Sequence, residues 1–146
     1  MLRYLIAILA TCLLASCGAK VAGTEPAQAE AKPRPMQTQL MPFTANDLSL
    51  SALLDTPTNG EAKALVIFVH GYGPTNVVEQ NWYYDLGLRF AKQGVSSFVW
   101  DKPGQGKSEG VFDANQPVES SAAEVVAAAQ FLRASDVPGS QKIGIW

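Results

Sequence analysis

Side chains that bind metals or act as bases are scarce in this chain of 146 residues. It has one histidine, His70, and two cysteines, Cys12 and Cys17. A metal site needs clustered His, Cys or carboxylate ligands, so we expect neither a metal site nor another cofactor. Charge is scarce too, because charged residues make up 16 % and the net charge is −2. Such a chain offers no basic surface for a polyphosphate backbone, and nucleic acid is not an expected partner.

Apolar residues, by contrast, are plentiful. They make up 47 % of the chain, which is enough to bury a core and excludes global disorder. At roughly 100 to 200 residues per domain, the length allows one domain, or part of a larger one, but not two.

The first apolar segment predicts export. Met1–Arg3 is a short basic start, and Tyr4–Leu14 is an almost unbroken apolar run. A membrane-spanning helix needs about 20 apolar residues, whereas the apolar region of a secretory signal needs about 7 to 15. We therefore interpret this segment as part of a signal peptide.

The four residues Leu14-Ala15-Ser16-Cys17 resemble the lipobox of bacterial lipoproteins. The resemblance implies cleavage after residue 16 and a diacylglycerol on the thiol of Cys17, so the protein would be exported and anchored by lipid to the bacterial cell envelope. Because Cys12 is removed and Cys17 blocked, no disulfide would form within the chain. The alternative is that both cysteines are small apolar residues of a signal cut elsewhere.

Three segments are predicted. Residues 1–16 form the signal peptide. Residues 17–35 consist mainly of Ala, Pro, Glu, Lys and Gln, and they form a disordered tether because they cannot bury enough surface to offset their ordering entropy. Residues 36–146 form a partial folded domain.

Hydrophobic patterning in this domain predicts an α/β fold. A continuous apolar run, Ala64–Val69, is typical of a strand buried on both faces of a parallel sheet. The expected order is a β-hairpin, then β-α-β-α-β: strands Gln37–Phe43 and Leu48–Leu54, strand Ala64–Val69, helix Gln80–Gln93, strand Val95–Trp100, a helix opened by Pro117, and strand Lys142–Trp146.

The two helices have expected inner faces. Helical spacing places the side chains of Trp82, Leu86 and Phe90 together, with Gly94 as the C-terminal stop. In the second helix one apolar stripe is expected, and Ser121 with Glu124 fits a capping box. That stripe consists of Val118, Ala122, Val125, Val126, Ala129 and Leu132.

Two loops that follow strands could carry chemistry. His70-Gly71-Tyr72-Gly73 comes directly after a buried strand, at the end where α/β sheets place their ligand sites. Such a loop can aim a backbone N–H, here that of Tyr72, at an oxygen that becomes negative during acyl transfer. The alternative is an ordinary turn with a packed histidine.

The second loop, Asp101–Gly110, contains three glycines and a proline. Its glycine spacing does not match a phosphate-binding loop, and a nucleotide-binding module is the third hypothesis. We interpret Asp101 and Lys107 as turn-stabilising and solvated residues.

Taken in order, H-G-x-G after one strand, D-x-x-G-x-G-x-S-x-G after the next, an Ala-rich helix and the strand K-I-G-I-W resemble the N-terminal part of an α/β-hydrolase. The branch is that of serine aminopeptidase-like, monoacylglycerol-lipase-like and dipeptidyl-aminopeptidase-like esterases. The resemblance covers residues 36–146 and departs from the commoner loop at Pro103. It implies that His70 and Gly71 shape an oxyanion loop, that Tyr72 donates one of its N–H groups, and that Gly73 continues the turn.

In this family the strand matching Lys142–Trp146 leads into the nucleophile elbow, G-x-S-x-G, with the acid and histidine following. The chain ends at Trp146, so the catalytic triad is absent from these residues, and as they stand we expect no catalysis. We therefore hypothesise the N-terminal part of a lipid-anchored serine hydrolase that acts on a small ester or peptide-like substrate. The alternative is a non-catalytic lipoprotein that serves as a binding or interaction module. We also expect the second edge of the last strand to be open.

Overall fold

The computed structural model describes residues 35–71 and 73–146, which fall in one compact unit, Lys32–Trp146. The predicted signal peptide, the lipidation of Cys17, the tether up to Arg34 and the N–H of Tyr72 lie outside the described residues. Within them the elements are β1 (Met36–Leu40), β2 (Phe43–Ala45), β3 (Leu48–Leu50), β4 (Ala52–Pro57), β5 (Ala64–Ile67), α1 (Tyr84–Lys92), β6 (Val95–Trp100), α2 (Val118–Ala134) and β7 (Ile143–Ile145).

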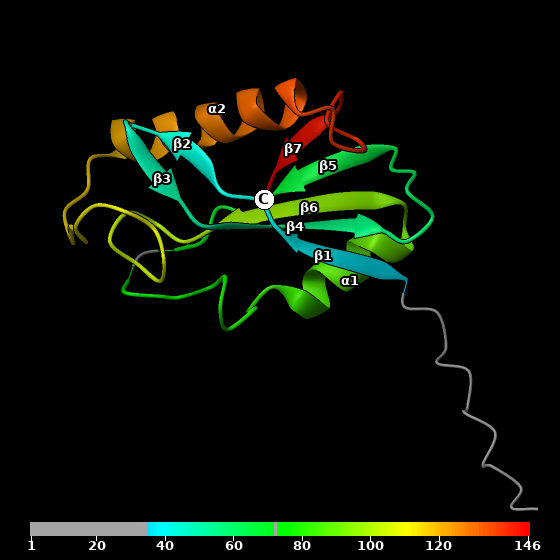
Figure 1. Cartoon of the computed structure of the whole chain (residues 1–146), viewed down its shortest axis with the longest axis horizontal. Helices are drawn as coiled ribbons and strands as arrows, with labels where there is room; N and C mark the ends of the chain where they lie inside the picture. Colours follow the sequence, from blue (N-terminus) through cyan, green and yellow to red (C-terminus); the bar gives the residue numbers. More distant parts are fainter. Residues whose placement is uncertain (1–34, 72) are drawn as a thin grey trace, which may run out of the picture. The chain divides into compact units, whose positions relative to one another are not determined.

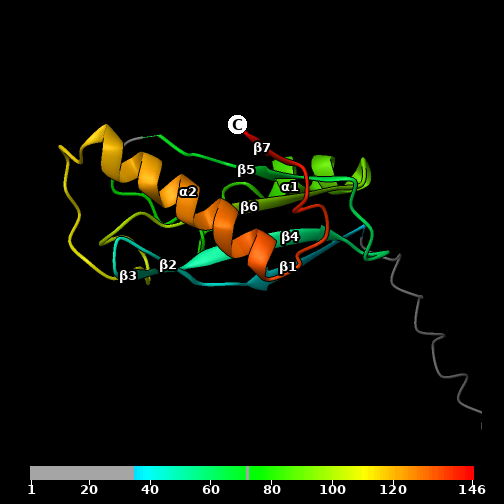
Figure 2. The same cartoon turned by 90° about the horizontal axis from the view of Figure 1, so that it is seen from above.

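Five strands form one mixed sheet in the order β1-β4-β6-β5-β7. β6, β5 and β7 run parallel, while β1 and β4 are antiparallel to their neighbours. Alternate strand residues contribute to two separate apolar clusters, one that includes residues of α2 and one that includes residues of α1. The helices therefore cover opposite faces of the sheet (Figures 1 and 2), and the predicted α/β class is confirmed.

The predicted hairpin is present but divided into two pairs, β1 with β4 and β2 with β3. The two pairs share the same register. Pro42, which lies between β1 and β2, therefore falls opposite Ser51, which lies between β3 and β4. Proline has no N–H to donate to the ladder, and both backbone groups of Ser51 bond elsewhere: its N–H donates to Ser108 Oγ and its carbonyl accepts the N–H of Asp101, each at 2.9 Å. At the tip, Asn46 and Asp47 have φ of 50° and 61°, as a type I′ hairpin turn requires.

Helix α1 begins four residues later than predicted. Asn81 has a φ of 48°, a left-handed conformation that does not continue into a helix, and the preceding residues form turns. Trp82 therefore lies outside the helix and is 59 % exposed, so its prediction as part of the inner face was wrong. The predicted stop at Gly94 is confirmed, with a φ of 69° and its N–H donated to Ala91 O.

Helix α2 follows Pro117 as predicted, but its buried face differs from the predicted stripe. Its buried residues are Glu124, Ala128 and Leu132, whereas three residues of the predicted stripe, Val118, Ala122 and Val126, are exposed. No side chain caps the helix start. The capping-box interpretation of Glu124 was therefore wrong.

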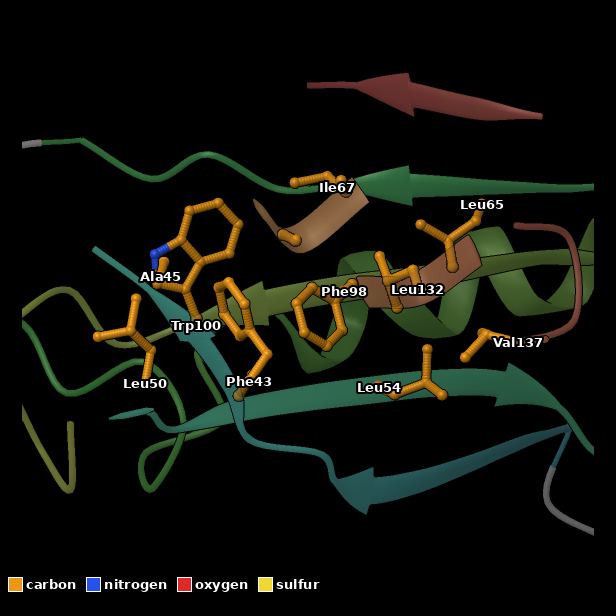
Figure 3. Packing of buried hydrophobic residues seen from close by; sticks show 12 residues of the cluster. Phe43, Ala45, Leu50, Leu54, Leu65, Ile67, Phe98, Trp100, Leu132 and Val137 are labelled. Carbon is orange, nitrogen blue, oxygen red and sulfur yellow. The ribbon is translucent and has the colours of Figure 1, made fainter. Parts of the chain in front are cut away.

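The larger core lies between the sheet and α2 (Figure 3). Its centre is aromatic: the ring of Phe43 lies edge-on to those of Phe98 and Trp100, with centroids 5.6 Å apart in each pair. Leu132 of α2 packs beside them. Since Phe43 belongs to the small β2–β3 hairpin, this hairpin closes the core where the main sheet ends.

The outer edge at β7 is open in the described part of the chain, as predicted. β7 pairs with β5 alone. Ile145 and Trp146 are 66 % and 63 % exposed, and they line an apolar groove between β7 and α2 with a volume of about 490 Å³.

Candidate functional site

The carboxyl ends of the three parallel strands meet at one edge of the sheet, where α/β folds place their ligand sites. β5 leads into His70 and Gly71, and β6 leads into the loop that begins at Asp101. The N–H of Val69 donates to Trp146 O at 2.9 Å. The end of β7 therefore lies directly beside the loop that begins with His70.

His70 is a buried tie between two strand ends, with 8 % of its surface exposed. Its Nε2 lies 2.9 Å from Trp100 O, and its Nδ1 lies 3.1 Å from Gly71 O. Because a carbonyl can only accept, a proton on Nε2 makes the bond to Trp100. The ring thus fixes the loop after β5 against the end of β6, and both of its nitrogens face backbone.

Two glycines flank the position of Tyr72. Gly73 has a φ of 134°, which a residue with a side chain rarely adopts. Gly71 is exposed, and a Cβ built there would meet no other atom within 4 Å. The backbone conformation of Gly73 and the open space at Gly71 are typical of a loop whose backbone a ligand can approach closely.

Asp101 is buried, so the prediction that it is solvated was wrong, but it stabilises a turn as predicted, because it holds the first residues of the turns before α1. It is 1 % exposed, and its Oδ1 accepts the N–H groups of Val77 and Val78 at 2.7 and 3.1 Å. Burial raises the pKa of this carboxyl, while the two backbone bonds act in the opposite direction. The carboxylate ties the segment after the His70 loop to the end of β6. A clue to this role is its position directly after a buried strand.

The N–H groups of the Asp101–Gly110 loop are largely used within the protein. Those of Gly104, Gln105, Ser108 and Glu109 each donate to a backbone carbonyl, and Ser108 Oγ donates to Asp101 O at 2.6 Å. A Cβ on Gly104 would overlap the backbone N of Phe112. This glycine therefore allows one backbone to approach another, which argues against a phosphate-binding role.

An ion pair inside the protein was not predicted. The carboxylate of Glu124 is fully buried, and its Oε2 lies 3.6 Å from Lys102 Nζ. It accepts hydrogen bonds from Trp100 Nε1, at 2.9 Å, and from Gln116 Nε2. The sequence held one signal: Glu124 is spaced four and eight residues before Ala128 and Leu132, on the same helical face.

A pocket of about 190 Å³ opens beside the His70 loop. It is lined by His70, Gly71, Thr75, Val77, Trp82 and Tyr83. No group of three His, Cys, Asp or Glu residues in the described ranges could hold a metal ion. In the same part of the chain, no helix is long and apolar enough to cross a bilayer.

Comparison with protein families gives one match, and it covers more than half of the chain. The family described as serine aminopeptidase, S33, matches residues 60–143. The match includes the loops after β5 and β6 and all of α1 and α2. No curated protein matches the chain.

Solved structures with the same fold include several esterases. Est1E from Butyrivibrio proteoclasticus, with ferulic acid bound, is 24 % identical with a TM-score of 0.59, over 72 % of this chain and 41 % of that chain. An esterase from Pyrococcus furiosus is 19 % identical with a TM-score of 0.61, over 75 % and 39 %. An α-amino acid ester hydrolase is 14 % identical with a TM-score of 0.62, over 90 % and 24 %. The chain thus spans about two fifths of the first two proteins, and identities this low show the fold alone.

Proposed function

Because the chain belongs to the serine aminopeptidase S33 family of α/β-hydrolases, we propose that it forms the N-terminal part of a serine hydrolase that cleaves ester or peptide-like acyl bonds. One observation carries the proposal most directly. The hydrogen bond from Val69 N–H to Trp146 O places the end of β7 beside His70 and Gly71. A nucleophilic serine that followed β7, as the nucleophile elbow does in this fold, would stand next to the loop.

In the proposed reaction, that serine hydroxyl attacks the substrate carbonyl, and the carbonyl oxygen becomes negative in the tetrahedral intermediate. Backbone N–H groups of the loop, that of Tyr72 among them, would stabilise this charge. Loss of one such donor typically costs about 3 to 4 kcal/mol in the barrier. His70 and Gly71 would shape the loop, and Gly73 would continue its turn.

The general base would not be His70. Both of its ring nitrogens lie against backbone carbonyls, so neither nitrogen is placed to accept a proton from a nucleophile. The nucleophile, the acid and the catalytic histidine would then all come from residues beyond Trp146. Supporting this, the chain spans 41 % and 39 % of two structures that share its fold.

We propose further that a lipid on Cys17 anchors the enzyme to the bacterial cell envelope. The proposal rests on Leu14-Ala15-Ser16-Cys17 and on the apolar run before it. A diacylglycerol would be sufficient for stable anchoring, since two acyl chains bind a membrane far more firmly than one. Intact mass should show the lipid on the natural protein and its loss in Cys17→Ser.

The decisive experiment uses the protein purified from its host. Its intact mass is measured, and the protein is treated with a fluorophosphonate that labels activated serines. The proposal expects a mass well above that of residues 17–146 plus lipid, and one label on a serine in a G-x-S-x-G sequence. A mass equal to residues 17–146 plus lipid, with no label, would reject the enzyme and favour a binding or interaction module.

A further inference from the structure

The pocket beside the His70 loop is lined partly by aromatic side chains. Among the described residues that line it, His70, Trp82 and Tyr83 carry aromatic side chains. The ring of Tyr83 is stacked on Phe68, with centroids 5.3 Å apart, and Val77 is 1 % exposed. These two residues are therefore fixed by the core, and they form a rigid apolar wall.

Trp82 differs from the other two aromatic lining residues, because most of it is exposed whereas His70 is buried and Tyr83 is half-buried. Its side chain is 59 % exposed, although a tryptophan is among the costliest residues to leave in water. Its backbone N–H donates to Val77 O at 3.3 Å, and its indole Nε1 donates to Gln80 Oε1. The first bond fixes the backbone of Trp82 and the second ties its indole to Gln80, and neither buries the ring.

The backbone before Trp82 leaves the helical path. Asn81 is held at a φ of 48°, a left-handed conformation that asparagine adopts more readily than most residues. The same conformation ends the turns before α1 and keeps Trp82 out of the helix. An exposed indole, a left-handed residue next to it and a pocket at the strand end thus occur together.

We propose that this pocket binds a planar aromatic group of the substrate, stacked on the indole of Trp82. The inference rests on the proposed function, since His70 and Gly71 line the pocket and also shape the loop that would hold the reacting carbonyl. The substrate class is therefore an ester or amide with an aromatic ring close to the carbonyl. A single ring fits, because apolar cavities of about 150 Å³ are known to bind benzene and this pocket has about 190 Å³.

Stacking explains why an aromatic group is favoured over an aliphatic group of equal size. Aromatic pairs with centroids about 4.5 to 7 Å apart gain roughly 0.5 to 1.5 kcal/mol beyond the area they bury. An aliphatic ring gains only the buried area. The pocket should therefore separate two ligands that differ in this property alone.

The test compares methyl benzoate with methyl cyclohexanecarboxylate as ligands of the purified chain, below the concentration at which it associates. His70 is the only histidine in the sequence, so its ring signals in NMR spectra report on this pocket without ambiguity. The variants are Trp82→Ala and Trp82→Phe. Trp146→Ala is the matched control, because Trp146 is 63 % exposed but lines the groove between β7 and α2 instead.

We expect methyl benzoate to shift the His70 signals saturably and more tightly than the cyclohexane ester. Trp82→Ala should weaken its binding by about 3- to 10-fold, in the range of one aromatic pair. Trp82→Phe should weaken it less, and Trp146→Ala should leave it unchanged. Equal binding of the two esters, equal binding to Trp82→Ala, or no shift of the His70 signals would each overturn the inference.

Failure here is distinguishable from failure of the proposed function. A protein that is labelled by the fluorophosphonate but shows no preference for methyl benzoate would keep the function and lose the aromatic subsite. Preferential binding that depends on Trp82, in a protein without the serine label, would keep the subsite and lose the hydrolase.

Discussion

The indole Nε1 of Trp100 donates a 2.9 Å hydrogen bond to Glu124 Oε2 inside the core, joining the end of β6 to the middle of α2. The same oxygen lies 3.6 Å from Lys102 Nζ, and the backbone O of Trp100 faces His70 Nε2 at 2.9 Å. Glu124 therefore sits at the end of a chain of polar contacts that begins in the His70 loop. A buried carboxylate is tolerated there because it has three partners.

Removing the Glu124 carboxylate should lower the stability of the folded protein. In Glu124→Leu, Lys102 and the Trp100 indole N–H lose their acceptor, and breaking a buried ion pair in this way typically costs about 3–5 kcal/mol. Glu124→Gln keeps an acceptor oxygen for the indole and should therefore lose less stability than Glu124→Leu. Urea unfolding of the purified chain measures both.

The control for this prediction is Glu119→Gln, which changes an exposed glutamate in the first turn of the same helix. It should stay within about 0.5 kcal/mol of the original protein, as most surface substitutions do. A Glu124→Leu protein as stable as Glu119→Gln would show that the polar contacts contribute nothing.

Glu124 also shows what the sequence could not reveal about α2. Helical periodicity correctly located the helix and its start after Pro117, but the apolar stripe drawn through Val118 and Val126 followed hydrophobicity alone. Once Lys102 and Trp100 supply partners, a glutamate is more stable on the inner face than periodicity allows. Partners that come from a distant strand cannot be seen in the helix sequence itself.

The buried carboxyl of Asp55 should make stability depend on pH. Burial raises its pKa, although hydroxyl bonds from Thr38 and Ser97 oppose the rise. The native state then holds the proton more tightly than the unfolded chain. Its stabilising contribution is complete below the unfolded pKa, about 3.9, and is lost as pH rises through the native pKa.

Asp55→Asn removes this dependence. We expect the variant to gain stability relative to the original protein as pH rises from 4 to 7, measured by urea unfolding at each pH. Asp47→Asn, an exposed carboxyl in the β2–β3 turn, serves as the control and should follow the original protein at every pH. Parallel curves for the Asp55→Asn and original proteins would contradict the prediction.

Gly87 of α1 should resist replacement by alanine because of the same carboxyl. Alanine in place of glycine normally stabilises a helix interior by about 0.8 to 1.0 kcal/mol. Here a Cβ would overlap Asp55 Oδ2 and lie 3.1 Å from Ser97 Oγ. We expect Gly87→Ala to destabilise the protein by about 1–3 kcal/mol, as overpacking does.

A double-mutant cycle tests the cause. If Asp55 is what the new methyl group meets, Gly87→Ala should cost much less in an Asp55→Ala background. Equal costs in the two backgrounds would mean that the close approach is not the reason for glycine at this position.

For the sheet, the sequence was a good guide. The strand Val95–Trp100 has the predicted bounds, and the continuous apolar run of β5 is indeed buried between two helices. The prediction was wrong where contacts with residues distant in sequence, or the conformation of a single residue, override the local hydrophobic pattern. Pro42 divides the hairpin because it has no N–H to donate, and Ser51 opposite it bonds instead to Ser108 and Asp101, two residues of another loop. Asn81 shortens α1 although Trp82 and its neighbours follow helical spacing.

For the candidate site, the sequence predicted where the loop lies in the chain but not how the side chains around it pack. The position of His70 and Gly71 at a strand end follows from the order of apolar runs and glycines. The burial of Asp101 and the pocket that Trp82 lines do not, because both depend on how the segment of residues 73–83 folds back on the strand ends. That segment has no hydrophobic period of its own from which its path could be derived.

The open edge at β7 should make the 146-residue chain associate with itself. In the described structure β7 has one neighbouring strand, and the adjoining groove of about 490 Å³ is lined largely by valine, isoleucine and tryptophan side chains. An unpaired strand edge with exposed apolar residues is a template for pairing with another chain. Sedimentation velocity should therefore show species whose size increases with protein concentration.

Ile145→Lys should shift the distribution toward monomer, because a lysine on an edge strand opposes pairing. Val111→Lys, at an isolated loop residue that is 84 % exposed, should not, and a similar shift in both variants would attribute the association to overall surface charge rather than to this edge.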